Sequence, residues 1–248
     1  MNMDTQRLAL IEENYRRVHE NIRAALRRRR AGTGEVSLLA GTKTVPPEEI
    51  LFAVRSLGLC LIGENRASEL TAKYPALAGQ CEQHFIGHLQ TNKVRHVVGR
   101  VTMIESVDSE RLAAEIDRRS RELGITTDIL IEVNSGREEN KSGVLPERVH
   151  AAAAAFSAYP NLRVRGLMTM APACTEKEAY RKYFRETYEI FIDIFAKNTH
   201  NIIEPVLSMG MSDSYEIAIE EGATEIRVGS AVFGRRTYGA PAAGQDPE

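Results

Sequence analysis

A regular alternation of strand-like and helix-like segments constrains the fold of this chain more than any other feature. After one long helical pattern over residues 4–30, a short apolar segment followed by a helical pattern occurs eight times in series. Strands that alternate with helices in this way run parallel and are joined by helical crossovers. Eight such units fit a closed barrel better than an open sheet. The sequence therefore predicts an α/β protein, a single (β/α)8 TIM barrel with an additional N-terminal helix.

Residue types alternate within the predicted strands as a barrel requires. The strands are predicted at residues 37–42, 59–63, 84–87, 102–107, 128–134, 164–170, 205–208 and 225–228. The helices between and after them are predicted at residues 46–57, 66–73, 92–98, 110–123, 146–158, 176–197 and 213–221, with a short helix after Gly229. Ile129 and Ile131 share a strand face opposite Glu132, and Ile226 lies opposite Arg227. We expect the apolar faces to pack against the helices and the polar faces to line the barrel.

Composition excludes several classes of protein. The 248 residues carry a formal net charge of -2, so we expect neither a nucleic-acid partner nor a membrane surface. The three cysteines show no CxxC spacing, so we expect no structural metal site and no disulfide framework. The absence of a long apolar run and of a signal-peptide pattern favours a cytoplasmic protein. We expect residues 1–236 to form one domain, residues 237–248 to form a flexible tail, and the chain to be a monomer.

Lys43 is the first candidate functional residue. The segment LLAGTKTVPPEE, residues 38–49, places this lysine where a predicted strand ends and two prolines open a helix. Ligands bind TIM barrels at the C-terminal ends of the strands. The lysine is either a surface residue or an amine that forms a Schiff base with an aldehyde, which needs the unprotonated form that burial favours. Lys93 and Lys141 compete for this role, but both lie several residues beyond a predicted strand.

Two glycine-bearing segments after the last two predicted strands form a candidate phosphate site. Ser208 offers a hydroxyl, and Gly229 and Ser230 begin a short helix whose free N–H groups attract an anion. The loops after strands seven and eight often hold phosphate in TIM barrels. The alternative is that Ser212 or Asp213 only caps the helix that follows.

Arg227 completes this set of residues. Strand parity points it into the barrel, where it either neutralises Glu225 or Glu132 as a structural pair or contacts a ligand. A lysine, a phosphate site and an inward arginine around one barrel mouth fit an aldehyde that carries a phosphate. Pyridoxal 5′-phosphate (PLP) and a phosphosugar aldehyde both meet this description.

The sequence resembles the pyridoxal phosphate homeostasis proteins (the YggS/PROSC type) over about residues 5–236. The segments that carry the resemblance, in order, are GTKTVPPEEI, IGEN, HFIGHLQTNK, SVDS, NKSGV, RGLMTM and LSMGMSDSYEIAIEEGATEIRVGSAVFG. The last segment is highly specific, and the shorter ones gain weight from their shared order. The resemblance implies an alanine-racemase-like barrel, the fold of type III PLP proteins.

The resemblance also implies roles for individual residues. Lys43 would be the lysine that holds PLP as a Schiff base. The other cofactor-binding residues would be Ser208, Met209, Gly229 and Ser230 around the phosphate, Arg227 beside the pyridine nitrogen, and Asn65 and Met168 along the pocket. Arg66 departs from the family pattern, which often has an aromatic residue after GEN, and this leaves the pocket entrance undefined.

These roles favour a binding protein over an enzyme. Arginine only donates protons in hydrogen bonds, so the pyridine nitrogen beside Arg227 would stay unprotonated and PLP would be a weak electron sink. By resemblance, racemases of this type carry a second domain with a further acid/base residue, and this sequence shows none. We expect a non-catalytic protein of PLP homeostasis, with PLP-dependent apo-enzymes as possible partners. The alternatives are a type III PLP enzyme such as an amino-acid racemase, and a Schiff-base aldolase that acts on phosphosugars.

Overall fold

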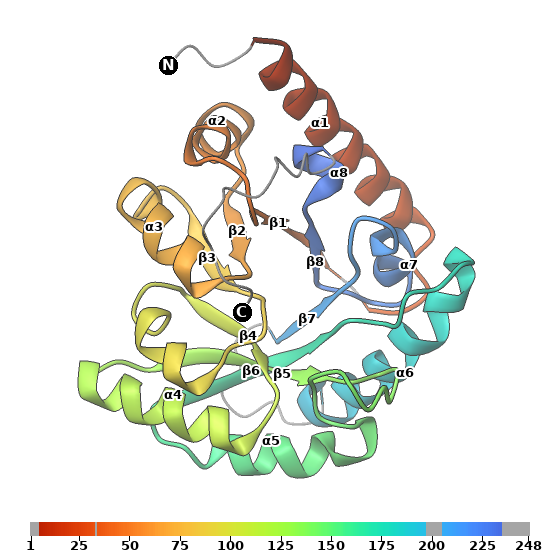
Figure 1. Ribbon diagram of the computed structural model, residues 1–248. Coiled ribbons are helices and arrows are strands. Elements are labelled where there is room, and N and C mark those ends of the chain that lie inside the picture. The colour runs from red at the N-terminus through yellow and green to blue at the C-terminus, as the bar shows by residue number, and fades with distance from the viewer. Residues whose placement is uncertain (1–4, 33, 197–204, 235–248) are drawn as a thin grey trace.

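Eight parallel strands close into a barrel in which each strand pairs with the next and β8 pairs with β1 (Figure 1). The structure is a computed structural model that describes residues 5–32, 34–196 and 205–234. The strands are β1 (Ser37–Gly41), β2 (Leu61–Glu64), β3 (Glu82–Phe85), β4 (Met103–Val107), β5 (Thr127–Val133), β6 (Leu162–Thr169), β7 (Val206–Met209) and β8 (Glu225–Val228). The predicted TIM barrel with an additional N-terminal helix is confirmed. The predicted tail, residues 237–248, lies outside the described residues.

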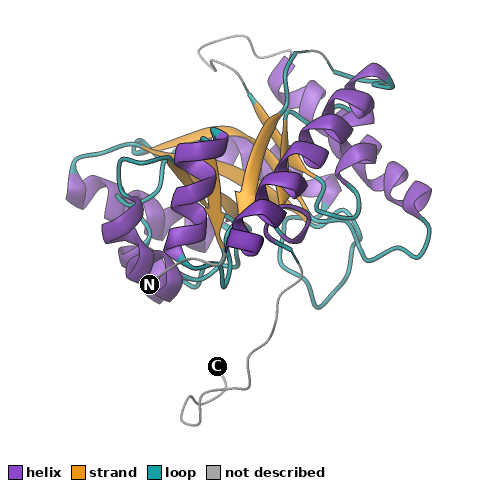
Figure 2. Ribbon diagram, turned by 90° about the horizontal axis from the view of Figure 1, so that it is seen from above, coloured by secondary structure: helices purple, strands orange, loops and turns teal. Residues whose placement is uncertain are grey.

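Helices surround the strands, as the view from above shows (Figure 2). The α-helices are α1 (Thr5–Arg27), α2 (Pro47–Leu57), α3 (Ala67–Leu77), α4 (Glu110–Leu123), α5 (Val149–Ser157), α6 (Arg181–Phe191), α7 (Tyr215–Glu220) and α8 (Ser230–Phe233). Short 3₁₀ helices are η1 (Thr91–His96), η2 (Pro146–Arg148) and η3 (Lys177–Tyr180), and η4 (Ile192–Ala196) is a π-helical turn. No helix among these described segments has the length and apolar character needed to cross a membrane.

Several predicted boundaries were wrong. The helix expected over residues 92–98 is the 3₁₀ helix η1, and the one expected over residues 176–197 is divided among η3, α6 and η4. The first helix ends at Arg27 and not at residue 30, because the following residues bond to α7: Arg28 Nε donates to Glu220 at 2.7 Å, and Arg30 N donates to the Glu220 carbonyl at 2.7 Å.

The apolar residues of the strands divide between two cores, as the parity of the sequence predicts. Ile129, Ile131 and Ile226 belong to the large outer core between the strands and the helices. Leu130 and Met168 belong to a small cluster inside the barrel. Leu39, in register with the inward Arg227, is also buried outside the large core. The interior further contains buried charged side chains, among them Glu105, Glu132 and Glu225.

Helix α1 lies across the outside of the barrel beside α2, α7 and α8 (Figure 1). Its side chains Ile11, Val18 and Ile22 are buried there. Asn14 Nδ2 donates to the Val232 carbonyl of α8 at 3.1 Å. The apolar stripe of α1 is therefore covered within the chain, and α1 holds α8 at the end of the barrel where β1 and β8 finish.

Candidate functional site

A cavity of about 410 Å³ lies at the C-terminal ends of β1 and β8. Lys43, two residues beyond the end of β1, lines it together with Gly229 and Ser230, which follow β8. The remaining lining residues are Arg7, Gly41, Thr44, Val45, Pro46, Glu49, Phe233 and Gly234. The structure thus brings the predicted lysine and one of the two predicted phosphate loops to the same cavity.

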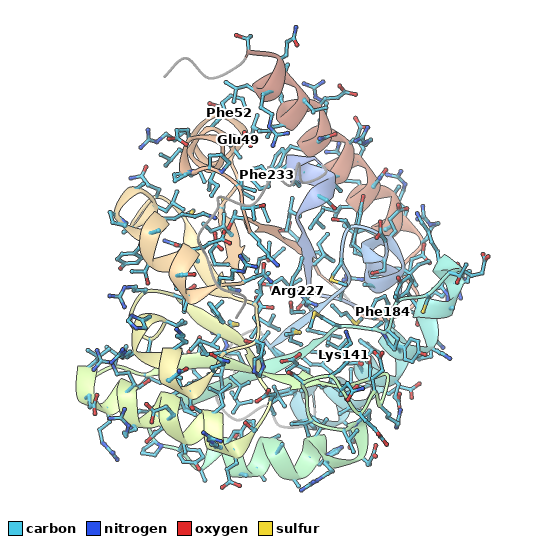
Figure 3. The ribbon with its side chains drawn as sticks, in the orientation of Figure 1. Glu49, Phe52, Lys141, Phe184, Arg227 and Phe233 are labelled. Atoms are coloured by element: carbon cyan, nitrogen blue, oxygen red, sulfur yellow. The ribbon has the colours of Figure 1, made fainter. Side chains whose placement is uncertain are left out.

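The outer wall of this cavity is formed by elements that are distant in sequence. Arg7 of α1 makes a two-pronged ion pair with Glu49 of α2, with Nε to Oε1 at 3.0 Å and Nη2 to Oε2 at 2.7 Å. Figure 3 shows Glu49 and Phe233 projecting from the neighbouring elements α2 and α8. Sequence reasoning missed both members of this pair, because 42 residues separate them.

The main chain on both sides of Lys43 is fixed by two residues of α3, Glu69 and Lys73, which we call the α3 clamp. Lys73 Nζ donates to the Thr42 carbonyl at 2.8 Å, and the Thr44 N–H donates to Glu69 Oε2 at 2.7 Å. Thr44 has a φ of 65°, a left-handed conformation that a β-branched residue rarely adopts. Such strain persists only where the surroundings impose it, and here the clamp imposes it on the residue next to Lys43.

Buried charges hold the clamp in place. Lys73 Nζ lies 2.6 Å from Glu64 Oε1 and 3.1 Å from Glu69 Oε2, and the exposed fractions of the Lys73 and Glu64 side chains are only 8% and 1%. Thr42 Oγ1 donates to the same Glu64 oxygen at 2.7 Å. Burial raises the pKa of Glu69, but the bonds from the Thr44 N–H and Lys73 outweigh burial, so its pKa lies below the usual value.

Ser208 and Arg227 lie inside the barrel and bond to each other. Arg227 Nη1 donates to Ser208 Oγ at 2.8 Å, and Nη2 donates to the Thr169 carbonyl at 2.7 Å. Ser208 Oγ in turn donates to Glu105 Oε2 at 2.6 Å. Arg227 lies within the ring of strands (Figure 3), and it is 5% exposed. Among the described residues, no ion pair joins Arg227 to Glu225 or Glu132. The charge of Arg227 still acts on Glu132, because it opposes the rise that burial causes in the pKa of that carboxyl.

The other predicted residues are not gathered at the cavity. Met168 is fully buried inside the barrel against Met103 and Leu130. Met209 is also fully buried, but its side chain belongs to the outer core. Asn65 is half-buried in the bend after β2 and is not one of the described residues that line the cavity.

The competing lysines lie where the sequence placed them. Lys93 belongs to the 3₁₀ helix η1, and Lys141 is exposed in the loop between β5 and η2. The predicted helix cap at Ser212 or Asp213 is wrong, since the residue before α7 is Ser214 and its side chain makes no cap bond there. Ser212 Oγ instead accepts a hydrogen bond from the Ala231 N–H of α8 at 3.3 Å.

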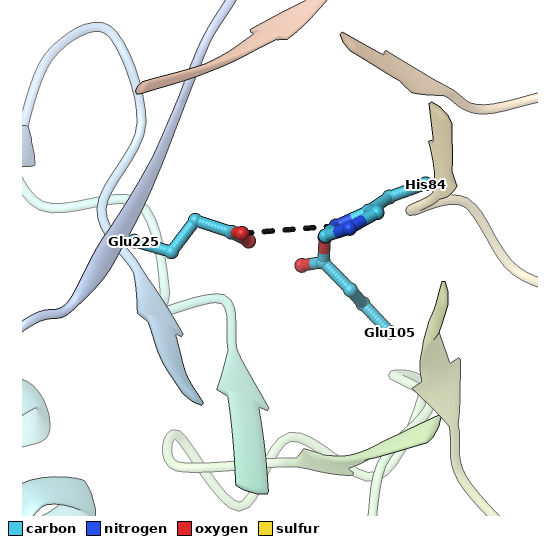
Figure 4. A group of neighbouring side chains, drawn as sticks. All are labelled: His84, Glu105 and Glu225. Carbon is cyan, nitrogen blue, oxygen red and sulfur yellow. Dashed lines mark hydrogen bonds and ion pairs between the residues drawn. The ribbon is translucent and has the colours of Figure 1, made fainter. Parts of the chain in front are cut away.

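A second group of polar side chains fills the barrel below Arg227. His84 Nδ1 lies 2.8 Å from Glu105 Oε1 and 3.7 Å from Glu225 Oε2 (Figure 4). Burial, together with the charge of Glu105, raises the pKa of Glu225 to about 8. Burial also raises the pKa of Glu105 and lowers that of His84, but their mutual hydrogen bond and charges reverse both shifts. Sequence reasoning missed this group, although charged residues within short apolar strands were a visible signal.

Comparison with known proteins places this geometry in a family. Residues 14–237 match the family described as alanine racemase, N-terminal domain. A pyridoxal phosphate homeostasis protein of Aquifex aeolicus is 44% identical over 91% of this chain and 98% of its own length. The chain belongs to the pyridoxal phosphate homeostasis protein family.

Further relatives support this assignment. The family member of Pseudomonas aeruginosa is 37% identical over 95% of this chain and 100% of its own length. The solved structure of PipY, the COG0325 family member of Synechococcus elongatus PCC7942 with PLP bound, has a TM-score of 0.76 and 29% identity and covers 90% of this chain and 100% of its own. The family resemblance read from the sequence is thereby confirmed.

Proposed function

We propose that this chain binds PLP as a Schiff base on Lys43 and acts in intracellular PLP homeostasis. The observation that carries the proposal is the shared cavity of Lys43, Gly229 and Ser230 at one end of the barrel. Its volume of about 410 Å³ falls within the range of small-molecule sites. The names of the relatives and the PLP in PipY support the choice of ligand.

The residues of the site have distinct roles in this proposal. Lys43 is held by the α3 clamp and supplies the amine, and Gly229 and Ser230 contact the phosphate. We expect any phosphate contact of Met209 to come from its main chain, because its side chain lies in the outer core. Ser208 orients Arg227 towards the pyridine nitrogen, since their bond fixes the guanidinium. We further propose that Asn65 and Met168 line the inner part of the pocket.

We propose that the protein does not turn over amino acids rapidly. Bound PLP supplies an electron sink, which an arginine next to its ring nitrogen weakens because arginine cannot accept a proton. None of the described residues that line the cavity is a tyrosine, cysteine or histidine, and Glu49 is held by Arg7. The cavity wall therefore offers no second acid/base group of the kind a racemase needs. The role that we propose is to buffer PLP, to deliver it to PLP-dependent apo-enzymes, or to regulate its supply.

Titration with PLP tests the proposal. The wild-type protein should develop visible imine absorbance with one PLP per chain, and Lys43→Ala should not. Lys141→Ala is the matched control, because it removes an exposed lysine of a different loop and should leave the absorbance unchanged. Retained absorbance in Lys43→Ala would contradict the assignment. Rapid loss of optical activity from an L-amino acid mixed with the PLP-loaded protein would contradict the non-catalytic role.

A further inference from the structure

Three metal-ligating side chains converge inside the barrel, at the end away from Lys43. His84, Glu105 and Glu225 come from β3, β4 and β8. One ligand atom from each lies within 4.8 Å of the other two, and all three residues are buried (Figure 4). An imidazole with two carboxylates is a donor set that Zn²⁺ and related first-row ions accept.

The separations of these atoms suit a small ion. A tetrahedral ion with bonds of about 2.1 Å holds its ligand atoms about 3.4 Å apart. His84 Nδ1 is 2.8 Å from Glu105 Oε1 and 3.7 Å from Glu225 Oε2, values that lie on either side of this spacing. Side-chain shifts of roughly half an ångström would therefore accommodate the ion.

An unsatisfied atom points to a missing ligand at the same place. Glu225 Oε1 is buried, and none of the described residues forms a hydrogen bond with it. The Glu225 side chain is only 4% exposed, and it is directed at His84 (Figure 4). A buried carboxyl oxygen without a partner is costly, and a cation that displaces the carboxyl proton would supply the missing interaction.

The surroundings provide an outer shell and an entrance. Ser208 Oγ donates to Glu105 Oε2, which matches the hydrogen bonds that usually orient ligating carboxylates. Glu105 Oε1 and His84 Nδ1 now share a hydrogen bond, and the ion would take the place of the proton between them. A cavity of about 670 Å³ reaches His84 and Glu225 from the N-terminal ends of the strands. Arg165 also lines this cavity. Its Nη1 donates to Asp128 at 2.6 Å, so the positive charge of Arg165 is paired with a carboxylate outside the proposed ligand set.

We propose that His84, Glu105 and Glu225 bind one divalent first-row transition-metal ion through His84 Nδ1, Glu105 Oε1 and a Glu225 carboxylate oxygen. Water from the 670 Å³ cavity completes the coordination. The two carboxylates balance the charge of the ion. His84 and Glu225 are reached from the N-terminal ends of the strands, whereas Lys43 follows the C-terminal end of β1. Ser208 links the two sites, because it bonds to Glu105 and to Arg227.

Cobalt titration of the purified full-length protein tests this site. Co²⁺ alone should bind at one equivalent per chain and produce the visible absorption of a four- or five-coordinate ion, and Zn²⁺ should displace it. Glu225→Gln keeps the size of the side chain and should weaken Co²⁺ binding about 100-fold or more. Glu132→Gln is the matched control, since it changes another buried carboxyl of the barrel interior outside the ligand set, and its affinity should equal that of the wild type.

Three results would overturn the proposal. They are no Co²⁺ binding by the wild type, equal binding by Glu225→Gln, or a thiolate-to-cobalt band that assigns the ion to cysteine. If circular dichroism shows that Glu225→Gln does not fold, anomalous diffraction from a Co²⁺-soaked wild-type crystal decides. The ion is expected about 2.1 Å from His84 Nδ1, and an ion elsewhere, or none, contradicts the proposal.

Discussion

Replacement of Lys73 by methionine removes the charge at the centre of the α3 clamp while keeping an unbranched side chain of similar length. The Lys73 ammonium lies 2.6 Å from Glu64 Oε1, and both side chains are almost fully buried. In the variant, the Glu64 carboxylate would keep only the hydrogen bond from Thr42 Oγ1. A buried charge left in this state is the main cost of the substitution.

The expected loss of unfolding free energy is about 3–5 kcal/mol, the usual result of breaking a buried ion pair from one side. The cost of Lys73→Met should fall by roughly 1–2 kcal/mol in a Glu64→Gln background, because no orphaned carboxylate then remains. The PLP affinity of Lys73→Met should also fall at least tenfold, since the Thr42 carbonyl next to Lys43 loses the charged one of its two donors and keeps only the Val45 N–H.

Urea denaturation followed by circular dichroism measures the stability, and absorbance titration measures the affinity. Arg16→Met serves as the control, because its partner Glu12 is half exposed and this surface pair should contribute little. A loss below about 1 kcal/mol in Lys73→Met would refute the view that this pair is a strongly coupled buried interaction. Unchanged PLP affinity in a destabilised variant would refute the positioning role of the clamp.

Three further predictions follow from single contacts. Burial raises the pKa of Glu132 to about 7 from an ordinary 4.5, so the folded state retains a proton that the unfolded state loses as the pH rises. The stability advantage of Glu132→Gln over the wild type should grow by up to about 3 kcal/mol between pH 5 and pH 8, and a difference independent of pH would contradict it. Ser208→Ala leaves Glu105 Oε2 without its donor and should cost about 1–3 kcal/mol in urea denaturation, whereas a neutral effect would argue against the interior network. A Cβ at Gly87 would lie 2.1 Å from the Asn65 carbonyl oxygen, so Gly87→Ala should lower the unfolding free energy by about 3 kcal/mol, and an unchanged denaturation midpoint would contradict this packing.

Strand parity made the barrel interior predictable from the sequence. Side chains alternate between two faces with a period of two, so the inward position of Arg227 and the outward position of Ile226 followed directly. The same rule applies to Ser208 and Met209, which are adjacent in β7 and must point in opposite directions. The expectation that both surround the phosphate came from the family resemblance, and parity shows that their side chains cannot both do so.

Contacts between distant elements were beyond the reach of sequence reasoning. Glu69 and Lys73 have the spacing of an ordinary surface ion pair on a helix, and only the packing of α3 against the end of β1 buries Lys73 beside Thr42. Arg7 and Glu49 likewise meet only because α1 lies across the barrel. Local sequence patterns do not predict such contacts, because tertiary packing determines which distant residues come together.

Borohydride reduction of the PLP-loaded protein, followed by peptide mapping with mass spectrometry, tests the central claim most directly. The reduction makes the bond between the cofactor and its lysine permanent, so the modified residue can be read from the peptides. The account predicts one phosphopyridoxyl group per chain, on the peptide that contains Lys43. Modification of Lys93 or Lys141 in its place, or no modification at all, would contradict it.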